Sequence, residues 1–183
     1  MTPFILKDKN KAFTLIELLV AIAIIGLLAT LVTFAIQNAG KKSRDTRRLS
    51  DLKQINTALQ LYYDTYKTYP TSASYGEGVS VTGCTGGWDC SHVNQDGAVD
   101  PYFMEFLVTS RLMAAAPKDP INDNNHHYKY YYYSGTGTTY GCERPFYVLV
   151  GFGFEAGKAT GDNVCYTPWA NNNSVYVIIS KNQ

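Results

Sequence analysis

One segment near the start of the chain restricts the fold more than any other. Residues 13–36 form a run of 24 residues with only one charged side chain, Glu17. Its other polar side chains are Thr14, Thr30 and Thr33. As an α-helix this run is about 36 Å long, enough to cross a hydrocarbon core of about 30 Å. The sequence therefore predicts a membrane-spanning helix.

A cleavable secretory signal is the main alternative for an apolar segment in this position. Such a signal has an apolar core of about 7–15 residues, followed by a cleavage site with small residues. The run in this chain is longer, and residues 37–40 (QNAG) match such a site poorly. A membrane-spanning helix is the better interpretation.

Glu17 is the unexpected residue, because a carboxylate in a membrane helix costs roughly 2–4 kcal/mol and is functional by default. In one interpretation Glu17, five residues after Ala12, lies near the membrane interface and reaches water. In the other, the chain is cut between Ala12 and Phe13, and Glu17 becomes the fifth residue. Its carboxylate could then pair with the new α-amino group of a neighbouring chain, close to a helix N-terminus that favours negative charge.

Residues 11–26 (KAFTLIELLVAIAIIG) follow a short basic leader and start an unbroken aliphatic run. This segment resembles the class III signal sequence of type IV pilins and type II secretion pseudopilins. The resemblance implies that a prepilin peptidase cuts between Ala12 and Phe13 and methylates the amine of Phe13, leaving a mature chain of 171 residues. It also implies that Glu17 guides subunit addition. The family usually has Gly where this chain has Ala12, and many members have a proline within the apolar run, which this chain lacks.

Beyond the apolar run, the helix is expected to continue as an amphipathic half. Apolar and aromatic residues recur there at three- and four-residue steps, as a core-facing helix requires. These residues are Leu49, Leu52, Ile55, Leu59, Tyr62, Tyr63 and Tyr66. The helix should stop near residues 67–69, because Pro70 disfavours helix at the residue before it.

The expected organisation has four parts. Residues 1–12 form a cleaved leader, residues 13–40 the transmembrane and filament-core helix, residues 41–69 its amphipathic half, and residues 70–183 a globular head with disulfide-stapled loops. We expect an α+β fold, the type IV pilin-like lollipop, in which the long helix packs on a small antiparallel sheet of three to four strands.

Several elements are expected in the head. Residues 71–99 are rich in Gly, Ser and Thr and predict a surface loop. Asp100 and Pro101 favour the start of a short helix over residues 101–114. A turn at residues 116–123 resembles the segment before the first strand of G-type pseudopilins. Three aromatic or β-branched segments predict strands, at residues 128–134, 145–153 and 174–180.

The chain has four cysteines, all in its second half: Cys84, Cys90, Cys142 and Cys165. An even number beyond a membrane segment suggests an oxidising compartment and two disulfides. Three pairings are open. We favour Cys84–Cys90 with Cys142–Cys165, because these pairs close small loops. Zinc is the weaker alternative, since neither pair has the Cys-x-x-Cys spacing.

Charge and cysteines disagree about membrane orientation. Three Lys precede the apolar run and five basic residues follow it within residues 41–48 (KKSRDTRR). The positive-inside rule would place the C-terminal part in the cytoplasm, whereas the cysteines place it outside. With the cysteines and the resemblance, we expect a precursor in the cytoplasmic membrane with the leader inside and the head outside. The mature chain is then expected in an extracellular or cell-surface filament.

The basic run also bears on partners. Residues 49–183 carry eight basic and twelve acidic residues, a net charge of −4. Between identical subunits packed side by side, a positive stem and a negative body would attract each other. DNA and lipid headgroups are further partners that this run allows.

No enzyme motif occurs: the chain has no nucleophile elbow, phosphate loop or zinc-protease helix motif. We expect neither catalysis nor a cofactor. Oxygen-bearing side chains make Asp119, Asn122 and Asp123 candidates for a calcium site, with ordinary turn chemistry as the alternative.

The sequence thus predicts a pilin, a structural subunit of a type IV pilus-like filament that polymerises through its apolar helix. Its expected partners are further copies of itself, prepilin peptidase, an inner-membrane assembly platform and, before assembly, the lipid membrane. A pseudopilin of a type II secretion system, which would form a short piston-like pilus, is one alternative. A membrane-anchored extracellular binding module is another.

Overall fold

The computed structural model describes residues 13–71, 88–91, 103–157 and 175–181. The chain divides into two compact units, residues 1–40 and 41–183. Helix α1 (Leu15–Tyr66, 52 residues) begins in the first unit and ends in the second. It ends where predicted, because Lys67 takes a left-handed conformation (φ 59°). The Lys67 N–H still donates to the carbonyl of Tyr63 at 2.8 Å, which closes the last turn.

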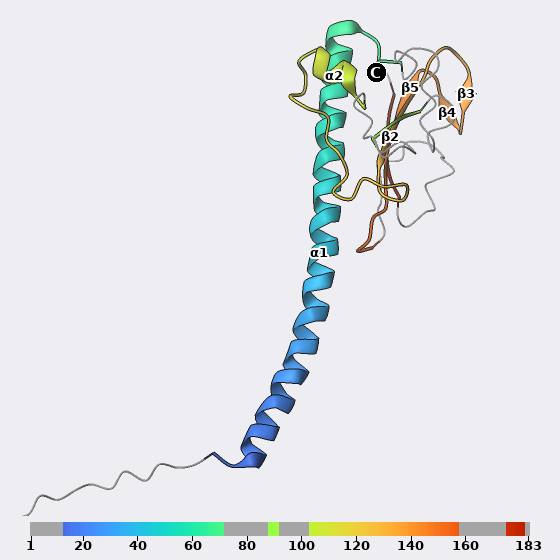
Figure 1. The fold of residues 1–183 in the computed structure, drawn as a ribbon. Helices are drawn as coiled ribbons and strands as arrows, with labels where there is room; N and C mark the ends of the chain where they lie inside the picture. The colour runs from blue at the N-terminus through green and yellow to red at the C-terminus, as the bar shows by residue number, and fades with distance from the viewer. Residues whose placement is uncertain (1–12, 72–87, 92–102, 158–174, 182–183) are drawn as a thin grey trace, which may run out of the picture. The chain divides into compact units, whose positions relative to one another are not determined.

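The second unit packs the amphipathic half of α1 on an antiparallel sheet with the strand order β1-β2-β5-β6 (Figure 1). The strands are β1 (Asp89–Cys90), β2 (Tyr128–Tyr133), β5 (Phe146–Phe152) and β6 (Val175–Lys181). All three pairings are antiparallel. The expected α+β architecture, a long N-terminal helix on a four-stranded sheet, is therefore confirmed.

The strand register explains the core. Tyr130 pairs with Leu149, and Leu149 pairs with Ile178, so these three side chains form one row across the sheet. They are buried in the same cluster as Leu52 and Leu59 of α1. Alternate residues of the same strands point to the opposite face, where they form a second buried cluster. Successive residues of β5 point to opposite faces of the sheet, and both sets are apolar. This strand therefore contributes to both buried clusters.

The tyrosines of β2 explain how aromatic residues carrying a hydroxyl can be fully buried. Tyr128 and Tyr130 are both 0% exposed. The hydroxyl of Tyr128 donates to the Asp51 carboxylate at 2.9 Å, and that of Tyr130 donates to the Pro70 carbonyl at 2.7 Å. Each ring therefore contributes to the core without leaving its hydroxyl unpaired.

The predicted helix at residues 101–114 is wrong in extent. Among the described residues, α2 covers only Glu105–Thr109. Met104 stops it on the N-terminal side, because it has φ 54° and donates its N–H to the Asp89 carboxylate at 2.9 Å. Asp100, the predicted cap, lies outside the described residues. Long-range contacts of a buried Met104 thus override the local signals for a longer helix.

The three predicted strands are present, with no end shifted by more than one residue. The predicted loop at residues 71–99 is wrong in one place, since Asp89–Cys90 form strand β1 beside β2. A small hairpin of β3 (Thr138–Thr139) and β4 (Cys142–Glu143) was not predicted. A strand of two residues is too short to show a periodic pattern in the sequence. Its pairing depends on the segments of the same chain that lie beside it in the fold.

Gly151 lets β5 lie close to α1. A Cβ atom at this position would lie 2.7 Å from Cδ1 of Leu52, whose side chain is fully buried. We expect Gly151→Ala to lower the free energy of unfolding by about 1–3 kcal/mol, the usual cost of overpacking a core. Denaturant unfolding of the full chain in detergent measures this. With Leu52→Ala also present, the glycine change should cost less; equal stability of Gly151→Ala and the wild type would contradict the argument.

Candidate functional site

The start of α1 is held by a reciprocal pair of side chains, Thr14 and Glu17. Glu17 Oε2 accepts hydrogen bonds from the Thr14 N–H at 2.9 Å and from the Thr14 hydroxyl at 2.8 Å. In return, the Thr14 hydroxyl oxygen accepts from the Glu17 N–H at 3.3 Å. This arrangement is a capping box, which satisfies two donors that a helix end leaves open. Within a single chain, Glu17 therefore stabilises the helix start.

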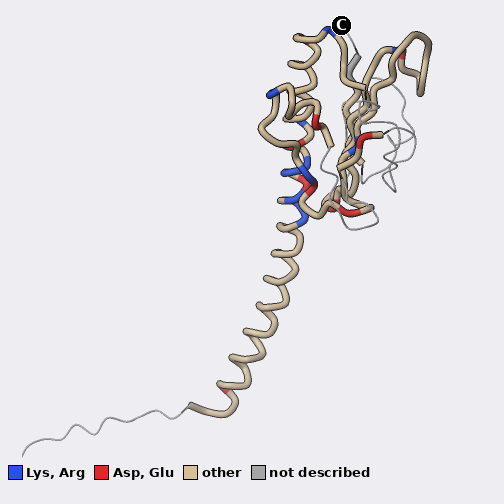
Figure 2. The backbone as a smooth tube through the Cα atoms, turned by 45° about the horizontal axis from the view of Figure 1, so that its top comes forward, with Lys and Arg blue, Asp and Glu red and all other residues tan. Residues whose placement is uncertain are grey.

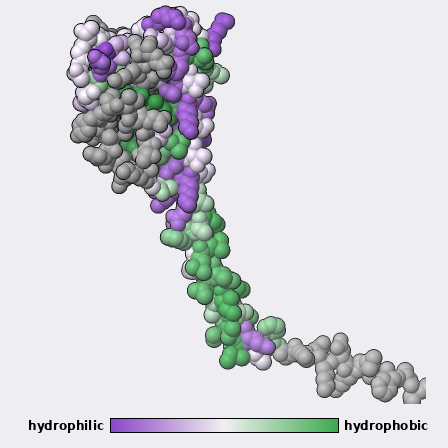
Figure 3. All heavy atoms as spheres, turned by 180° about the vertical axis from the view of Figure 1, so that it is seen from behind, coloured by the Kyte–Doolittle hydropathy of each residue, from purple (hydrophilic) through white to green (hydrophobic). Residues whose placement is uncertain are grey.

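Among the described residues of the first unit, 13–40, none covers the apolar part of α1. Its most apolar 18-residue window has a mean hydropathy of 2.8, and none of that window is buried. The side chains in view are strongly apolar over most of this part (Figure 3). Thr30 and Thr33 donate their hydroxyls to the carbonyls of Leu27 and Ala29, at 2.7 and 2.9 Å. Both threonine hydroxyls are therefore paired inside the helix, as a membrane requires.

Phe13 and Glu17 lie beside the same hollow on the helix surface. This hollow has a volume of about 400 Å³, and its other lining residues are Ile16, Val20, Ala21 and Ile24. Phe13 itself is 79% exposed. Ala12, the other half of the predicted cleavage junction, lies outside the described residues. The Glu17 carboxylate thus borders an apolar surface that is open to a neighbouring helix.

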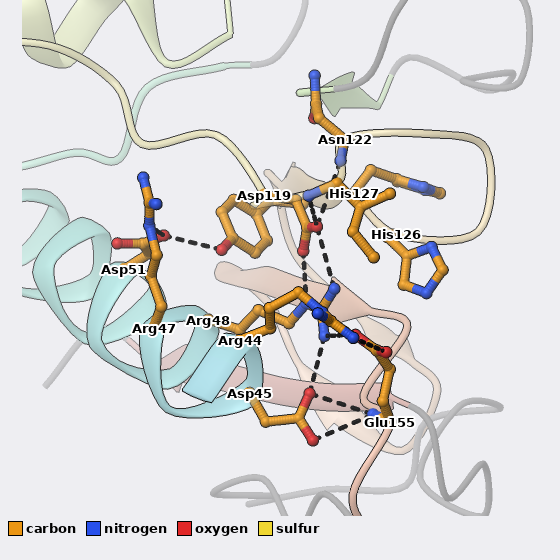
Figure 4. A network of polar contacts seen from close by, with 12 residues as sticks. Arg44, Asp45, Arg47, Arg48, Asp51, Asp119, Asn122, His126, His127 and Glu155 are labelled. Atoms are coloured by element: carbon orange, nitrogen blue, oxygen red, sulfur yellow. Dashed lines mark hydrogen bonds and ion pairs between the residues drawn. The ribbon is translucent and has the colours of Figure 1, made fainter. Parts of the chain in front are cut away.

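A second cluster of polar side chains, the Arg48 network, joins α1 to two loops of the second unit (Figure 4). It consists of Arg44, Asp45, Arg48, Asp119 and Glu155. The Arg48 side chain is 0% exposed. It donates from Nε and Nη2 to the two oxygens of Asp119, at 2.6 and 3.1 Å. Its Nη1 donates to Asp45 at 2.8 Å and to Glu155 at 2.9 Å.

The segment after β5 is fixed from two sides by the same helix turn. Arg44 donates from Nε and Nη2 to both oxygens of Glu155, at 2.8 and 2.5 Å. The carboxylate of Asp45 accepts the backbone N–H of Glu155 at 3.0 Å and that of Ala156 at 2.8 Å. Paired two-point contacts of this kind fix geometry as well as charge.

The contacts within the network shift the pKa values of its charged groups. Burial acts to lower the pKa of Arg48, but its bonds to Asp119 and Glu155 outweigh burial and raise it, so Arg48 stays charged. The hydrogen bond from Arg44, with help from Arg48, lowers the pKa of Glu155 from 4.5 to about 2. Nearby, burial raises the pKa of Asp51, although the Tyr128 hydroxyl partly offsets this. The negative charges of the carboxylates thus lie opposite the positive charges of Arg44 and Arg48.

The network changes the interpretation of the basic run at residues 41–48. Three of its five basic residues form ion pairs within the chain: Arg44 and Arg48 in the network, and Arg47 with Asp51 at 3.9 Å. The charges of Arg44 and Arg48 are therefore not free for DNA, lipid or a neighbour. Lys41, Lys42 and Arg47 are exposed. Figure 2 shows where Lys and Arg gather along the helix. One feature of the sequence could have revealed that Arg48 points inward. Position 48 lies on the same helix face as the core residues at 52, 55 and 59, which predicts an inward side chain.

The calcium candidates lie close together but have other partners. Asp119 Oδ1 accepts the N–H groups of Ile121 and Asn122 in addition to its bonds with Arg48. Asp123 Oδ1 accepts the N–H groups of Asn125 and His126, both at 2.8 Å. In the part of the chain that the structure describes, no three His, Cys, Asp or Glu side chains form a group that could hold a metal. Turn chemistry accounts for the positions of these side chains.

Two of the four predicted disulfide cysteines can be placed. Cys90 and Cys142 are fully buried and disulfide-bonded. Cys84 and Cys165 lie outside the described residues. The pairing Cys84–Cys90 with Cys142–Cys165 therefore stays a prediction.

Comparison with known proteins supplies the family. Residues 7–33 match the model of the prokaryotic N-terminal methylation motif. Type II secretion system core protein G of Pseudomonas aeruginosa is 32% identical over 101 residues, which are 52% of this chain and 70% of that protein. The chain belongs to the family of type IV pilins and type II secretion pseudopilins. The range of the motif match includes Ala12, Phe13 and Glu17, whose roles in processing and assembly stay predictions.

Other relatives of this pilin-like chain match shorter stretches. Core protein G of Escherichia coli is 37% identical over 65 residues, 36% of this chain and 45% of that protein. Type IV major fimbrial protein FimA of Dichelobacter nodosus is 40% identical over 55 residues, 30% of this chain and 35% of that protein. The chain thus spans less than half of these two relatives. No solved structure matches it significantly.

The lowered pKa of Glu155 predicts how the stability of this pilin-like chain depends on pH. Its pKa is lower in the folded state, so its stabilising contribution is complete above about pH 4.5 and is lost as the pH falls through about 2. We expect Glu155→Gln to make the free energy of unfolding fall less steeply than in the wild type over this range. Urea unfolding at a series of pH values measures the slopes.

The matched control is Glu143→Gln, which replaces an exposed glutamate outside the Arg48 network. Parallel slopes for Glu155→Gln and the wild type would show that Glu155 is not held by the two arginines.

Proposed function

We propose that this chain is a structural subunit of a type IV pilin-like filament. In this proposal a prepilin peptidase cuts between Ala12 and Phe13 and methylates the new amine. The subunits then polymerise through residues 13–36. Further copies of the chain are the main partners, together with an inner-membrane assembly platform.

One observation carries the proposal: an entirely exposed apolar helix begins within a methylation motif. A helix of this hydropathy does not remain in water, so it must lie in lipid or against other helices. Before assembly the membrane would cover it. After assembly, the apolar helices of neighbouring subunits would cover it. Polymerisation would therefore move the helix out of the lipid without exposing it to water.

Glu17 has a defined part in this scheme. Both hydrogen bonds that it accepts from Thr14 use Oε2, and Oε1 accepts none from the described residues. A neighbour's Phe13 amine, if free and charged, would give this carboxylate an opposite charge inside an apolar bundle. Because a buried ion pair is stable only with good geometry, such a contact would also fix the axial position of one subunit on the next.

The precursor would sit in the cytoplasmic membrane with its leader inside, and the assembled filament would lie outside the membrane. A role in DNA binding rests on the three exposed basic residues of the run at 41–48, since Arg44 and Arg48 pair internally. The names of the relatives are those of fimbrial and secretion-system proteins, and they name no enzyme.

A pseudopilin of a type II secretion system is the second candidate, favoured by the extent of similarity. The matches to core protein G of Pseudomonas aeruginosa and of Dickeya chrysanthemi cover 70% and 71% of those proteins. By length, both matches extend beyond residues 1–71 into the rest of the second unit. The match to FimA is shorter, at 55 residues and 35% of that protein. A membrane-anchored binding module is the third candidate, and it would require an uncut chain.

Processing gives the first test. We expect the mature protein, purified from its native cells, to begin at Phe13 and to carry one added methyl group. Intact mass and N-terminal sequencing measure both. A chain that still begins at Met1 would contradict the filament proposal and favour the anchored module.

Assembly gives the second test. We expect Glu17→Gln to lower the amount of sheared filament at least tenfold, because it removes the charge while keeping the hydrogen bond to Thr14 and the size of the side chain. Processing at Phe13 should be unchanged. Electron microscopy and immunoblotting of sheared material measure assembly, and loss of protein export on deletion of the gene would select the pseudopilin. Wild-type amounts of filament from Glu17→Gln would exclude the proposed role of the charge.

A further inference from the structure

A groove runs along the side of α1 that faces away from the sheet. It has a volume of about 660 Å³ and lies between α1 and the segment after α2, residues 112–115. Its walls combine apolar side chains, including Leu61, which is 48% exposed, and Met113, with the exposed amine-bearing side chain of Lys53. A partner that fits this groove needs an apolar side chain next to a negative charge.

The same chain carries such a pair on a turn, residues 121–123, which we term the tip. Ile121 is a large apolar residue with 41% exposure. Asp123 follows two residues later, and its side chain is 49% exposed. Its hydrogen bonds within the turn use Oδ1, so Oδ2 points at no other described residue.

The tip is rigid, which favours its use as a contact. Asp119, itself fixed by Arg48, accepts the N–H groups of Ile121 and Asn122. The Ser91 hydroxyl donates to Asn122 Oδ1 at 3.1 Å. A turn that is already ordered loses little conformational entropy on binding. Its exposed apolar side chain therefore has no evident role within the chain but suits an interface.

Groove and tip lie on opposite sides of α1. The groove uses helix positions 50, 53, 54, 57, 58 and 61. The tip is attached through Asp119 to position 48, on the face shared with positions 44 and 45. At 100° per residue the two sets of positions are about 155° apart around the helix axis, and the groove lies roughly 10–15 Å further along α1. One copy cannot fill its own groove with its own tip.

We propose that the groove of one copy of this chain receives the tip of the next copy, with Ile121 in its apolar part and Asp123 facing Lys53. The contact joins two different surfaces and includes a displacement along α1. Repetition of such a contact gives an open helical filament instead of a closed pair. This inference rests on the proposed function, since it names the surfaces through which the second units of filament subunits touch.

Cross-linking of native filaments tests the contact directly. A zero-length carbodiimide joins a Lys amine to a carboxylate only where the two touch. Applied to sheared wild-type filaments, it should give a peptide pair linking Lys53 to Asp123, found by mass spectrometry in covalent oligomers and absent from the monomer band. Because groove and tip lie on opposite sides of one chain, this link identifies two copies. Filaments cross-linked at other pairs, and never at this one, overturn the inference.

Charge variants test the energetics in the full chain. Lys53→Glu should lower the amount of filament about tenfold, because it places two negative charges opposite each other. Asp123→Asn, which keeps the Oδ1 acceptor of the turn, should give a smaller loss. The double variant Lys53→Glu with Asp123→Lys should recover filaments. The matched controls are Lys67→Glu and Glu143→Lys, exposed residues outside groove and tip, which should assemble as the wild type does.

The outcomes separate this inference from the proposed function. If wild-type chains are processed at Phe13 and form filaments, but Lys53→Glu assembles normally, the groove contact is wrong and the filament proposal stands. If processed wild-type chains form no filaments in native cells, both proposals fall. Recovery of assembly by the charge exchange, together with the Lys53–Asp123 link, supports both.

Discussion

The constraint on which everything else depends is an apolar helix that its own chain does not cover. In the first unit nothing described packs against residues 15–36, so the stability of this surface must come from lipid or from other copies. A globular protein would have folded such a segment into its core. Here the core is built instead from the following half of the same helix, whose apolar stripe begins around Leu49 and Leu52. One helix therefore serves two environments, divided near residue 40.

Arg48 lies in the second unit, near the start of the amphipathic half of the helix. A fully buried guanidinium is tolerated only with matched carboxylates, and Arg48 obtains them from its own helix, from the loop before β2 and from the segment after β5. The same contacts fix Asp119 and hence the turn at residues 121–123. The buried charge of Arg48 therefore holds the amphipathic helix to two loops. It also fixes the turn that presents Ile121.

The regular parts of this architecture could be predicted because their signals are local. The apolar run, the helix stop before Pro70 and the strands at Tyr128, Phe146 and Val175 each follow from composition and periodicity. The irregular parts could not. Met104 leaves the helical conformation to reach Asp89, fifteen residues away, and β3 and β4 have only two residues each. The inward turn of Arg48 was hidden because a run of basic residues suggests solvent, although its spacing from Leu52 and Ile55 indicates the core.

The Arg48 network leaves the conflict between charge and cysteines over orientation in place. The positive-inside rule opposed an outward head because five basic residues follow the apolar run and three precede it. In the folded chain Arg44 and Arg48 are neutralised by Glu155, Asp45 and Asp119. The positive-inside rule counts Lys and Arg, however, and carboxylates contribute little to it, so this pairing leaves the count at five against three. Buried, disulfide-bonded Cys90 and Cys142 are the observation that favours an oxidising compartment, and the outward orientation of the head stays a prediction.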